Sequence, residues 1–169
     1  MALTTVGTLI SQLGWTQTIT ENDVTQEDAG NITLGFTLSS GTGTKQVNGI
    51  WHADNILSSG GVDSFDLTAM TRNVLGGAYN VNFTNVKAII IKNRQTGIGF
   101  DINLQATGAN AFGNPFGFAT GQFDICPSSA LMRMNTYDGW NVGSGNSQFY
   151  IHDGGSGCAY SIAVIGVTG

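Results

Sequence analysis

The stretch NITLGFTL, residues 31–38, alternates large apolar side chains with small or polar ones and decides the fold class. Its apolar positions are Ile32, Leu34, Phe36 and Leu38. Because successive side chains of a β-strand point to opposite faces, this period of two predicts a strand with one face buried. Residues 39–44, SSGTGT, predict a flexible turn. We expect residues 46–52 to return as a second strand and close a hairpin.

A second β signal lies in residues 86–92, whose centre reads AIII. β-Branched residues favour strands, and the run is flanked by Lys87 and Lys92, which is typical of a central strand whose ends reach water. Residues 93–97 predict the following turn. The alternating residues that we expect to form the hairpin partner of this strand are Phe100, Ile102 and Leu104.

The remaining patterns predict one short helix and several short strands. Helical spacing occurs in residues 65–75, through Leu67, Met70 and Val74, with Asp63 or Ser64 as the N-cap. Further extended runs are residues 122–126, 130–134, 148–152 and 159–167. Evenly spaced short strands with Gly and Asn turns predict an all-β fold, an antiparallel β-sandwich or barrel. The count of about eight strands is that of a jelly roll.

The chain length of 169 residues predicts a single domain. We expect residues 26–169 to form the sandwich and residues 1–25 to form an arm that leaves it. The arm region is rich in Thr and lies beside an acidic cluster of Glu21, Asp23, Glu27 and Asp28.

Composition narrows the function classes. Charged residues make up only 10% of the chain, against about 25% in a typical protein. Neutral polar surfaces of this kind suit a protein that packs against neighbours. The net charge of -5 and six scattered basic residues exclude a large phosphate-binding face, so we expect no nucleic-acid partner.

No run of apolar residues reaches the length of a membrane span, so no membrane partner is expected. The first fifteen residues lack the basic start and apolar run of a signal peptide. Without export, Cys126 and Cys158 are expected to be free thiols.

No pattern of catalytic, cofactor-binding or metal-binding residues stands out. His152 precedes Asp153, a pair that could orient an imidazole, but an ordinary turn after a strand explains it better. His52 is expected at the end of a hairpin. The carboxylates fall mostly in turns, where Asp caps main-chain amides, and no nucleophile elbow or phosphate loop is present. We therefore predict a protein that is not an enzyme, with no cofactor and no metal.

Aromatic side chains are the remaining functional signal, because they anchor interfaces and stack on sugars. Residues 106–121, rich in Gly, Asn and Phe, predict an exposed loop. The interface candidates within it are Phe112, Phe116 and Phe118. Possible glycan-stacking residues near predicted turns are Trp51, Tyr137 and Trp140. For Trp140 we favour a structural role, plugging one end of the sandwich.

The half of the chain from Val86 onward carries an ordered set of features: residues 86–93 (VKAIIIKN), 124–131 (DICPSSAL), 139–142 (GWNV) and 159–166 (AYSIAVIG). This order resembles small structural proteins of tailed bacteriophages. The resemblance implies a jelly-roll or related β-sandwich that is added to a capsid or fibre, commonly as a trimer, with no active site to transfer. Where such proteins often have Pro-Gly-Gly, this chain has Pro127, Ser128 and Ser129.

Two functions are therefore expected from different classes. The first is a non-enzymatic virion structural protein, a capsid decoration, vertex or fibre-base subunit that assembles in the bacterial host cytoplasm. Its partners would be phage capsid or tail proteins and other copies of itself, as a homo-oligomer for which the resemblance implies a trimer. The alternative is a carbohydrate-binding module or lectin-like receptor-binding domain, in which Trp51, Tyr137 or Trp140 would stack on a glycan.

Overall fold

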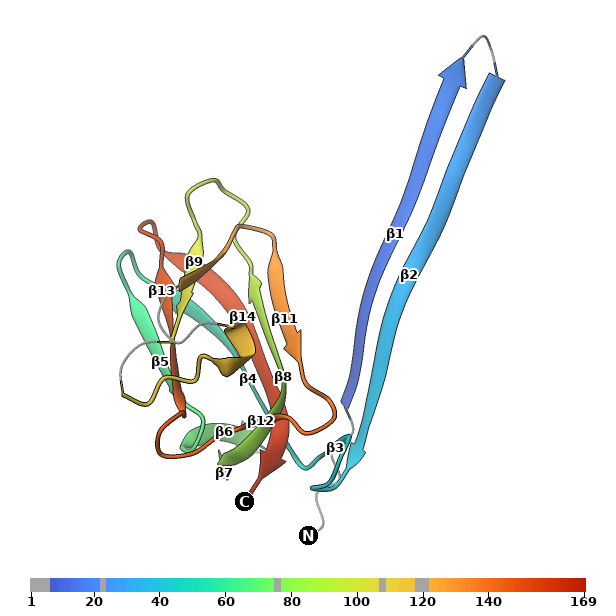
Figure 1. Cartoon of the computed structure of the whole chain (residues 1–169). Helices are drawn as coiled ribbons and strands as arrows, with labels where there is room; N and C mark the ends of the chain where they lie inside the picture. Colours follow the sequence, from blue (N-terminus) through green and yellow to red (C-terminus); the bar gives the residue numbers. More distant parts are fainter. Residues whose placement is uncertain (1–6, 22–23, 75–76, 107–108, 118–121) are drawn as a thin grey trace.

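A computed structural model describes residues 7–21, 24–74, 77–106, 109–117 and 122–169 (Figure 1). This part of the chain contains fourteen β-strands and a single-turn 3-10 helix, η1 (Asn114–Phe116). The predicted all-β fold is confirmed.

Two antiparallel sheets face each other and form the sandwich (Figure 1). The first sheet has the order β10 (Gln122–Ile125), β9 (Ile102–Gln105), β13 (Gln148–Asp153) and β5 (Val62–Asp66). The second has the order β11 (Ala130–Met134), β8 (Phe83–Asn93), β14 (Cys158–Thr168) and β4 (Gly49–Leu57), and β12 (Trp140–Asn141) pairs with β8. These nine strands are close to the eight predicted. The jelly-roll topology stays a prediction.

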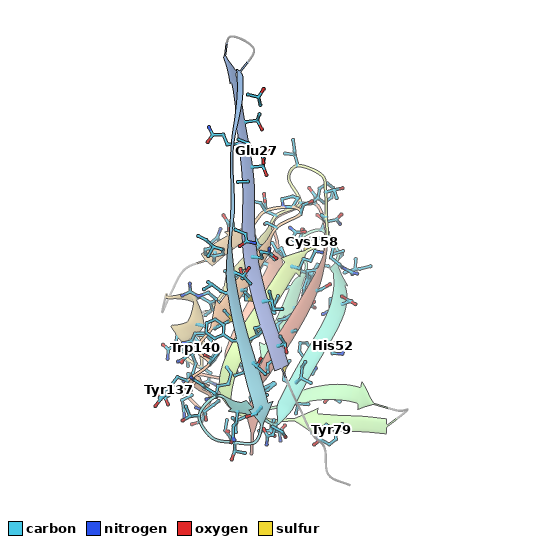
Figure 2. The ribbon with its side chains drawn as sticks, turned by 90° about the vertical axis from the view of Figure 1, so that its right-hand side faces the viewer. Glu27, His52, Tyr79, Tyr137, Trp140 and Cys158 are labelled. Atoms are coloured by element: carbon cyan, nitrogen blue, oxygen red, sulfur yellow. The ribbon has the colours of Figure 1, made fainter. Side chains whose placement is uncertain are left out.

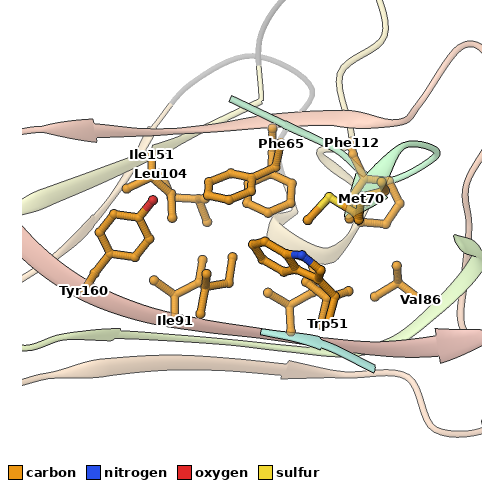
Figure 3. Packing of buried hydrophobic residues seen from close by; sticks show 14 of the residues in the cluster. Trp51, Phe65, Met70, Val86, Ile91, Leu104, Phe112, Ile151 and Tyr160 are labelled. Atoms are coloured by element: carbon orange, nitrogen blue, oxygen red, sulfur yellow. The ribbon is translucent and has the colours of Figure 1, made fainter. Parts of the chain in front are cut away.

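The main core lies between these two sheets (Figure 3). Leu104 and Ile151 of the first sheet are 1% exposed, and Ile91 of the second is fully buried. Aromatic rings fill one end of the core, where Phe65 stacks on Phe149 with ring centroids 5.0 Å apart. The two sheets thus enclose one continuous buried interior, as expected for a single domain of this length.

The two predicted hairpins are wrong in their pairing, although their strands exist. The strand that begins at Gly49 pairs with β14 and not with residues 31–38. Likewise, β9 pairs with β10 and β13 and not with β8. The alternation of apolar residues shows which face of a strand is buried, but any strand with the same alternation can serve as its partner.

The predicted helix over residues 65–75 is also wrong. The segment contains the end of β5 and all of β6 (Met70–Val74), which pairs with β7 (Gly77–Val81) as a separate ribbon. Between β5 and β6 the carboxylate of Asp66 accepts hydrogen bonds from the main-chain N–H of Thr68 at 3.0 Å and from its hydroxyl at 2.6 Å. This Asx-type turn competes with helix formation. Leu67, inside this turn, and Met70, at the start of β6, both reach the core.

A long hairpin leaves the base of the sandwich and stands away from it (Figure 1). It consists of β1 (Gly7–Glu21) and β2 (Val24–Ser40) and is called the arm below. The short strand β3 (Gln46–Val47) pairs in parallel with the end of β2. Residues 26–40, which the sequence assigned to the sandwich, thus lie in the second strand of the arm.

Candidate interaction surface

The arm is a regular antiparallel ladder. Its register runs without a bulge from Gly7 opposite Leu38 to Glu21 opposite Val24. Among the described residues, β1 pairs with β2 and with no other strand, and β2 pairs beyond β1 only at its last two residues. A two-stranded hairpin is marginally stable in water unless one of its faces packs on something. The side chains on its two faces therefore decide what the arm does.

One face of the arm is apolar and the other polar. Residues directly opposite each other share a face, so Phe36, Leu34 and Ile32 of β2 lie on the face that carries Leu9 of β1. We call these three β2 residues the apolar strip; their side chains are 39%, 54% and 56% exposed. The opposite face carries the pairs Thr8–Thr37 and Gln12–Thr33, with Ile10 opposite Gly35.

The sequence predicted residues 31–38 as a half-buried strand, and this holds only at its end. Leu38 is fully buried, whereas the three residues of the apolar strip face water in this single chain. Complete burial of side chains of this size is worth roughly 1.5–3 kcal/mol each. Because the side chains of the apolar strip stay largely exposed, the single chain does not gain much of this free energy.

The contacts at the root of the arm show that its apolar face is directed toward the sandwich. Leu9 and Leu38 pack with Val47, Ala88 and Ile165 in a second apolar cluster, apart from the main core. Since Ile89, Ile91 and Val164 face the main core, the alternating residues of β8 and β14 present this second cluster on the outer face of the sheet. Half-buried residues that pack around the cluster are Ile50, Ile90, Met132 and Met134.

The apolar strip is therefore continuous with a packed contact between the arm and the sheet. Figure 2 shows the arm rising past the face of the sandwich, with Glu27 near its far end. Residues 7–20 and 29–44 contain no charged side chain, whereas Glu21, Glu27 and Asp28 are near the tip. Residues 29–44, which include the apolar strip, are thus uncharged, and the charged residues toward the tip are acidic, whereas Lys45 lies in the turn at the root.

Hydrogen bonds hold the root of the arm in place. The N–H of Ser39 donates to the carbonyl oxygen of Lys45 at 3.2 Å, and that of Gly41 donates to Val47 at 3.0 Å. Gly41 has φ of 143°, a conformation that residues with a Cβ rarely adopt, so this turn favours glycine. These contacts fix the direction in which the arm leaves the sandwich.

The predicted phenylalanine loop is largely packed inward. Phe112 is fully buried, and its N–H donates to the carbonyl oxygen of Gln148 at 2.7 Å. Phe116 is half-buried and makes an edge contact with Phe149, with centroids 6.0 Å apart. Phe118 lies outside the described residues. The expectation of an exposed loop is thus wrong for Phe112, because a main-chain contact to β13 draws it into the core.

The three candidate glycan-stacking rings have different environments. Trp51 is 8% exposed, and its indole N–H donates to the carbonyl oxygen of Thr71 at 2.8 Å. Trp140 is half-buried and packs against the main core. Tyr137 is 60% exposed. The structure therefore does not bring the three rings together into one exposed platform.

The two histidines, candidates for an acid–base or metal-binding role, differ in their surroundings. His52 is exposed, and His152 lies beside the ring of Tyr150 with centroids 6.3 Å apart. No three His, Cys, Asp or Glu side chains of the described ranges cluster in a way that could hold a metal ion. In the same ranges, no helix is long and apolar enough to cross a membrane.

Two carboxylates bind groups of the fold itself. Asp153 accepts N–H donors from Gly60 at 2.9 Å and Gly155 at 3.0 Å. Asp63 accepts hydrogen bonds from the hydroxyl of buried Tyr160 and from the amide of Asn55, the latter at 2.9 Å. Burial, reinforced by the hydrogen bond to Asp63, raises the pKa of Tyr160 far above its usual value. These contacts link neighbouring strands and turns.

Sequence reasoning expected an arm in residues 1–25 but missed the hairpin, in which β1 pairs with residues 24–38. Its signal was present, because Leu9, Leu13, Trp15 and Ile19 keep a period of two that mirrors residues 31–38. The two-residue interval between Glu21 and Val24 is the commonest hairpin connection.

No family model matches the chain, and no curated protein matches it either.

Proposed function

We propose that this chain is a non-enzymatic structural protein of a bacteriophage virion, a capsid decoration, vertex or fibre-base subunit that oligomerises and binds the particle. The observation that carries the proposal is the arm, which projects from a packed sandwich and leaves the apolar strip in water. A monomer that works alone gains nothing from such an element, whereas a subunit of an assembly uses it as a contact.

Two further features support this role. The surface is poor in charge, which lowers the cost of removing it from water against a neighbour. Asp63 and Asp66 accept hydrogen bonds from hydroxyl or amide donors of the fold. One oxygen of Asp153 also accepts such bonds, whereas its other oxygen is buried without a hydrogen-bond partner among the described residues. The assignment to a bacteriophage, with assembly in the host cytoplasm, rests on the resemblance of the half from Val86 onward to small phage structural proteins.

The glycan-binding alternative has weaker support. Trp51 is buried and hydrogen-bonded, and Trp140 packs against the core, so one exposed ring, Tyr137, is left of the three candidates. A single ring without convergent polar groups is a weak basis for sugar recognition.

The test is to locate the protein. Particles purified from the host that carries the gene should contain the chain at a fixed copy number, measured by quantitative mass spectrometry and placed by antibody labelling. Its absence from particles would overturn the proposal. Binding on a glycan array that is lost in Tyr137→Ala, and kept in the matched exposed-ring control Tyr79→Ala, would favour the alternative; Tyr79 is 51% exposed.

A further inference from the structure

We propose that the apolar strip, Ile32, Leu34 and Phe36, is a docking surface for a second copy of this chain. The proposal deepens the assembly role given above and rests on it, and it assigns the contact to one face of one element.

The first step is that the apolar strip needs a cover. The arm has two strands along most of its length, and its own sandwich covers it only at the root, through Leu9 and Leu38. Beyond the root, all three side chains of the apolar strip remain at least 39% exposed. A hairpin gains independent stability from further strands or from a packed face. Packing of the apolar strip against another surface can supply this stability.

The second step identifies the occupant. The apolar strip continues into the arm-root cluster, and the half-buried residues Ile90, Met132 and Met134 flank that cluster on the outer face of the sheet. One chain thus presents two adjoining apolar surfaces, one on the arm and one on the sheet. At the root, the apolar face of the arm already packs on the outer face of this chain's own sheet, through Leu9 and Leu38 against Ala88 and Ile165. The sheet of a second copy presents the same outer face, so it offers the apolar strip a surface of the kind on which this side of the arm packs at its root.

The third step concerns charge. Residues 29–44 carry no charged side chain, so burying the apolar strip leaves no ion unpaired. The charges of the arm are acidic and lie near the tip, at Glu21, Glu27 and Asp28. A nucleic acid would be repelled by such a tip. A neutral apolar surface from another copy is the occupant that matches the apolar strip.

The test compares matched substitutions on the two faces of the arm. Leu34→Thr places a hydroxyl in the apolar strip, while Ile10→Thr makes a closely similar change on the polar face, where Ile10 is 64% exposed. Threonine suits strands, so neither variant should disturb the hairpin itself. Circular dichroism and thermal melts of the full chain confirm that both variants fold.

The readout is the mass in solution, from light scattering coupled to size exclusion. The wild type and Ile10→Thr should both form an oligomer, a multiple of the 17.7 kDa chain. Leu34→Thr should raise the dissociation constant at least about tenfold, which is about 1.4 kcal/mol of binding free energy. Hydrogen exchange gives a second readout, because amides of β1 and β2 should lose protection in Leu34→Thr alone.

Two results would overturn the inference. One is a wild-type chain that stays monomeric at every accessible concentration. The other is a Leu34→Thr variant that associates as tightly as Ile10→Thr, which would place the contact on a strand edge or elsewhere on the sandwich. A wild-type monomer would also remove self-association from the proposed function, but neither result decides whether the chain is part of the virion, since a monomer can still be found in purified particles.

Discussion

The ammonium nitrogen of Lys87 donates a hydrogen bond of 2.7 Å to the main-chain carbonyl oxygen of Tyr137. The same carbonyl accepts the N–H of Lys45 at 3.3 Å, in the turn at the root of the arm. Lys87 is 2% exposed, so a nearly buried cation of the central strand β8 holds the 135–139 loop, and the carbonyl of that loop also holds the turn that follows the arm. One carbonyl thus connects the arm to the sandwich.

The first prediction follows from this contact. Lys87→Met keeps the apolar part of the side chain, and the Tyr137 carbonyl keeps its second donor, so we expect a loss of stability within about 1 kcal/mol. Lys87→Ala removes the buried stem as well and should cost about 2–3 kcal/mol. Urea unfolding measures both. Equal losses in the two variants would show that the ammonium group, and not the stem, matters.

The same lysine predicts a pH dependence. Burial lowers the pKa of Lys87 below 10.5, and the charge of Asp138 opposes that shift. Between the lowered pKa and 10.5 the unfolded chain binds more protons than the folded one, so this group adds stability as pH rises through that window. The wild type should gain relative to Lys87→Met on going from neutral pH towards 10.5, with both measured in urea. A constant difference would contradict the shift.

A second prediction concerns the phenylalanine that the sequence placed in an exposed loop. Phe112→Ala should cost about 3–5 kcal/mol, because it leaves a cavity in the main core. Phe123, which is 44% exposed, is the matched control, and Phe123→Ala should change stability by no more than about 0.5 kcal/mol. Similar losses in the two variants would mean that Phe112 is not part of the packed core.

Phe112 also shows why part of the structure was predictable from the sequence and part was not. Period-two alternation located strands well, and the predicted strand 130–134 coincides with β11. Alternation carries no information on partners, so β4 and β9 were paired incorrectly. The inward turn of Phe112 depends on a hydrogen bond to Gln148, a contact 36 residues away along the chain that local composition does not encode.

The candidate surface, too, was only partly predictable from the sequence. Ile32, Leu34 and Phe36 are apolar and on one face, as the sequence indicated, but the sequence could not tell whether their own chain covers them. That depends on the direction of the arm, which the root contacts of Ser39 and Gly41 determine. Both contacts are made by main-chain atoms, so no side-chain pattern announces them.

A third prediction concerns the two thiols, which are both free. Cys126 is exposed, whereas Cys158 is 1% exposed. We expect a thiol reagent to label one cysteine quickly in the native chain and both after unfolding, with Cys126→Ser abolishing the fast reaction. Fast labelling that survives in Cys126→Ser would contradict the burial of Cys158.

Cys158 also contributes to an alkaline limit of stability. Burial raises the pKa of its thiol from 9.0 to about 11, and the charges of Asp153 and Asp63 raise it further in the same direction. The unfolded chain therefore loses its proton first as pH passes 9.0, and the contribution of the thiol is lost between that pH and about 11. Cys158→Ala should lose less stability over this interval than the wild type. Parallel curves would argue against the raised pKa.

The last prediction concerns Asp153, whose side chain joins two turns. Desolvation acts to raise the pKa of Asp153, but N–H donors of the main chain at Gly157, Gly60, Gly155 and Ser156 outweigh it and hold the pKa below 3.8. The folded carboxylate binds its proton less readily than the unfolded one does. Its contribution is therefore present above 3.8 and is lost as pH falls through the lowered pKa.

Asp153→Asn should consequently lose about 1.5–3 kcal/mol at neutral pH, because an amide replaces a charged acceptor of N–H groups. The variant should also lose less of its remaining stability than the wild type when pH falls below 3.8. Asp124→Asn, a change at an exposed carboxylate, is the matched control for the neutral-pH loss and should lower stability by no more than about 1 kcal/mol. Urea unfolding at neutral and acid pH measures all three chains. If Asp153→Asn keeps both the neutral stability and the acid slope of the wild type, the hydrogen bonds to Gly60 and Gly155 do not hold these turns together.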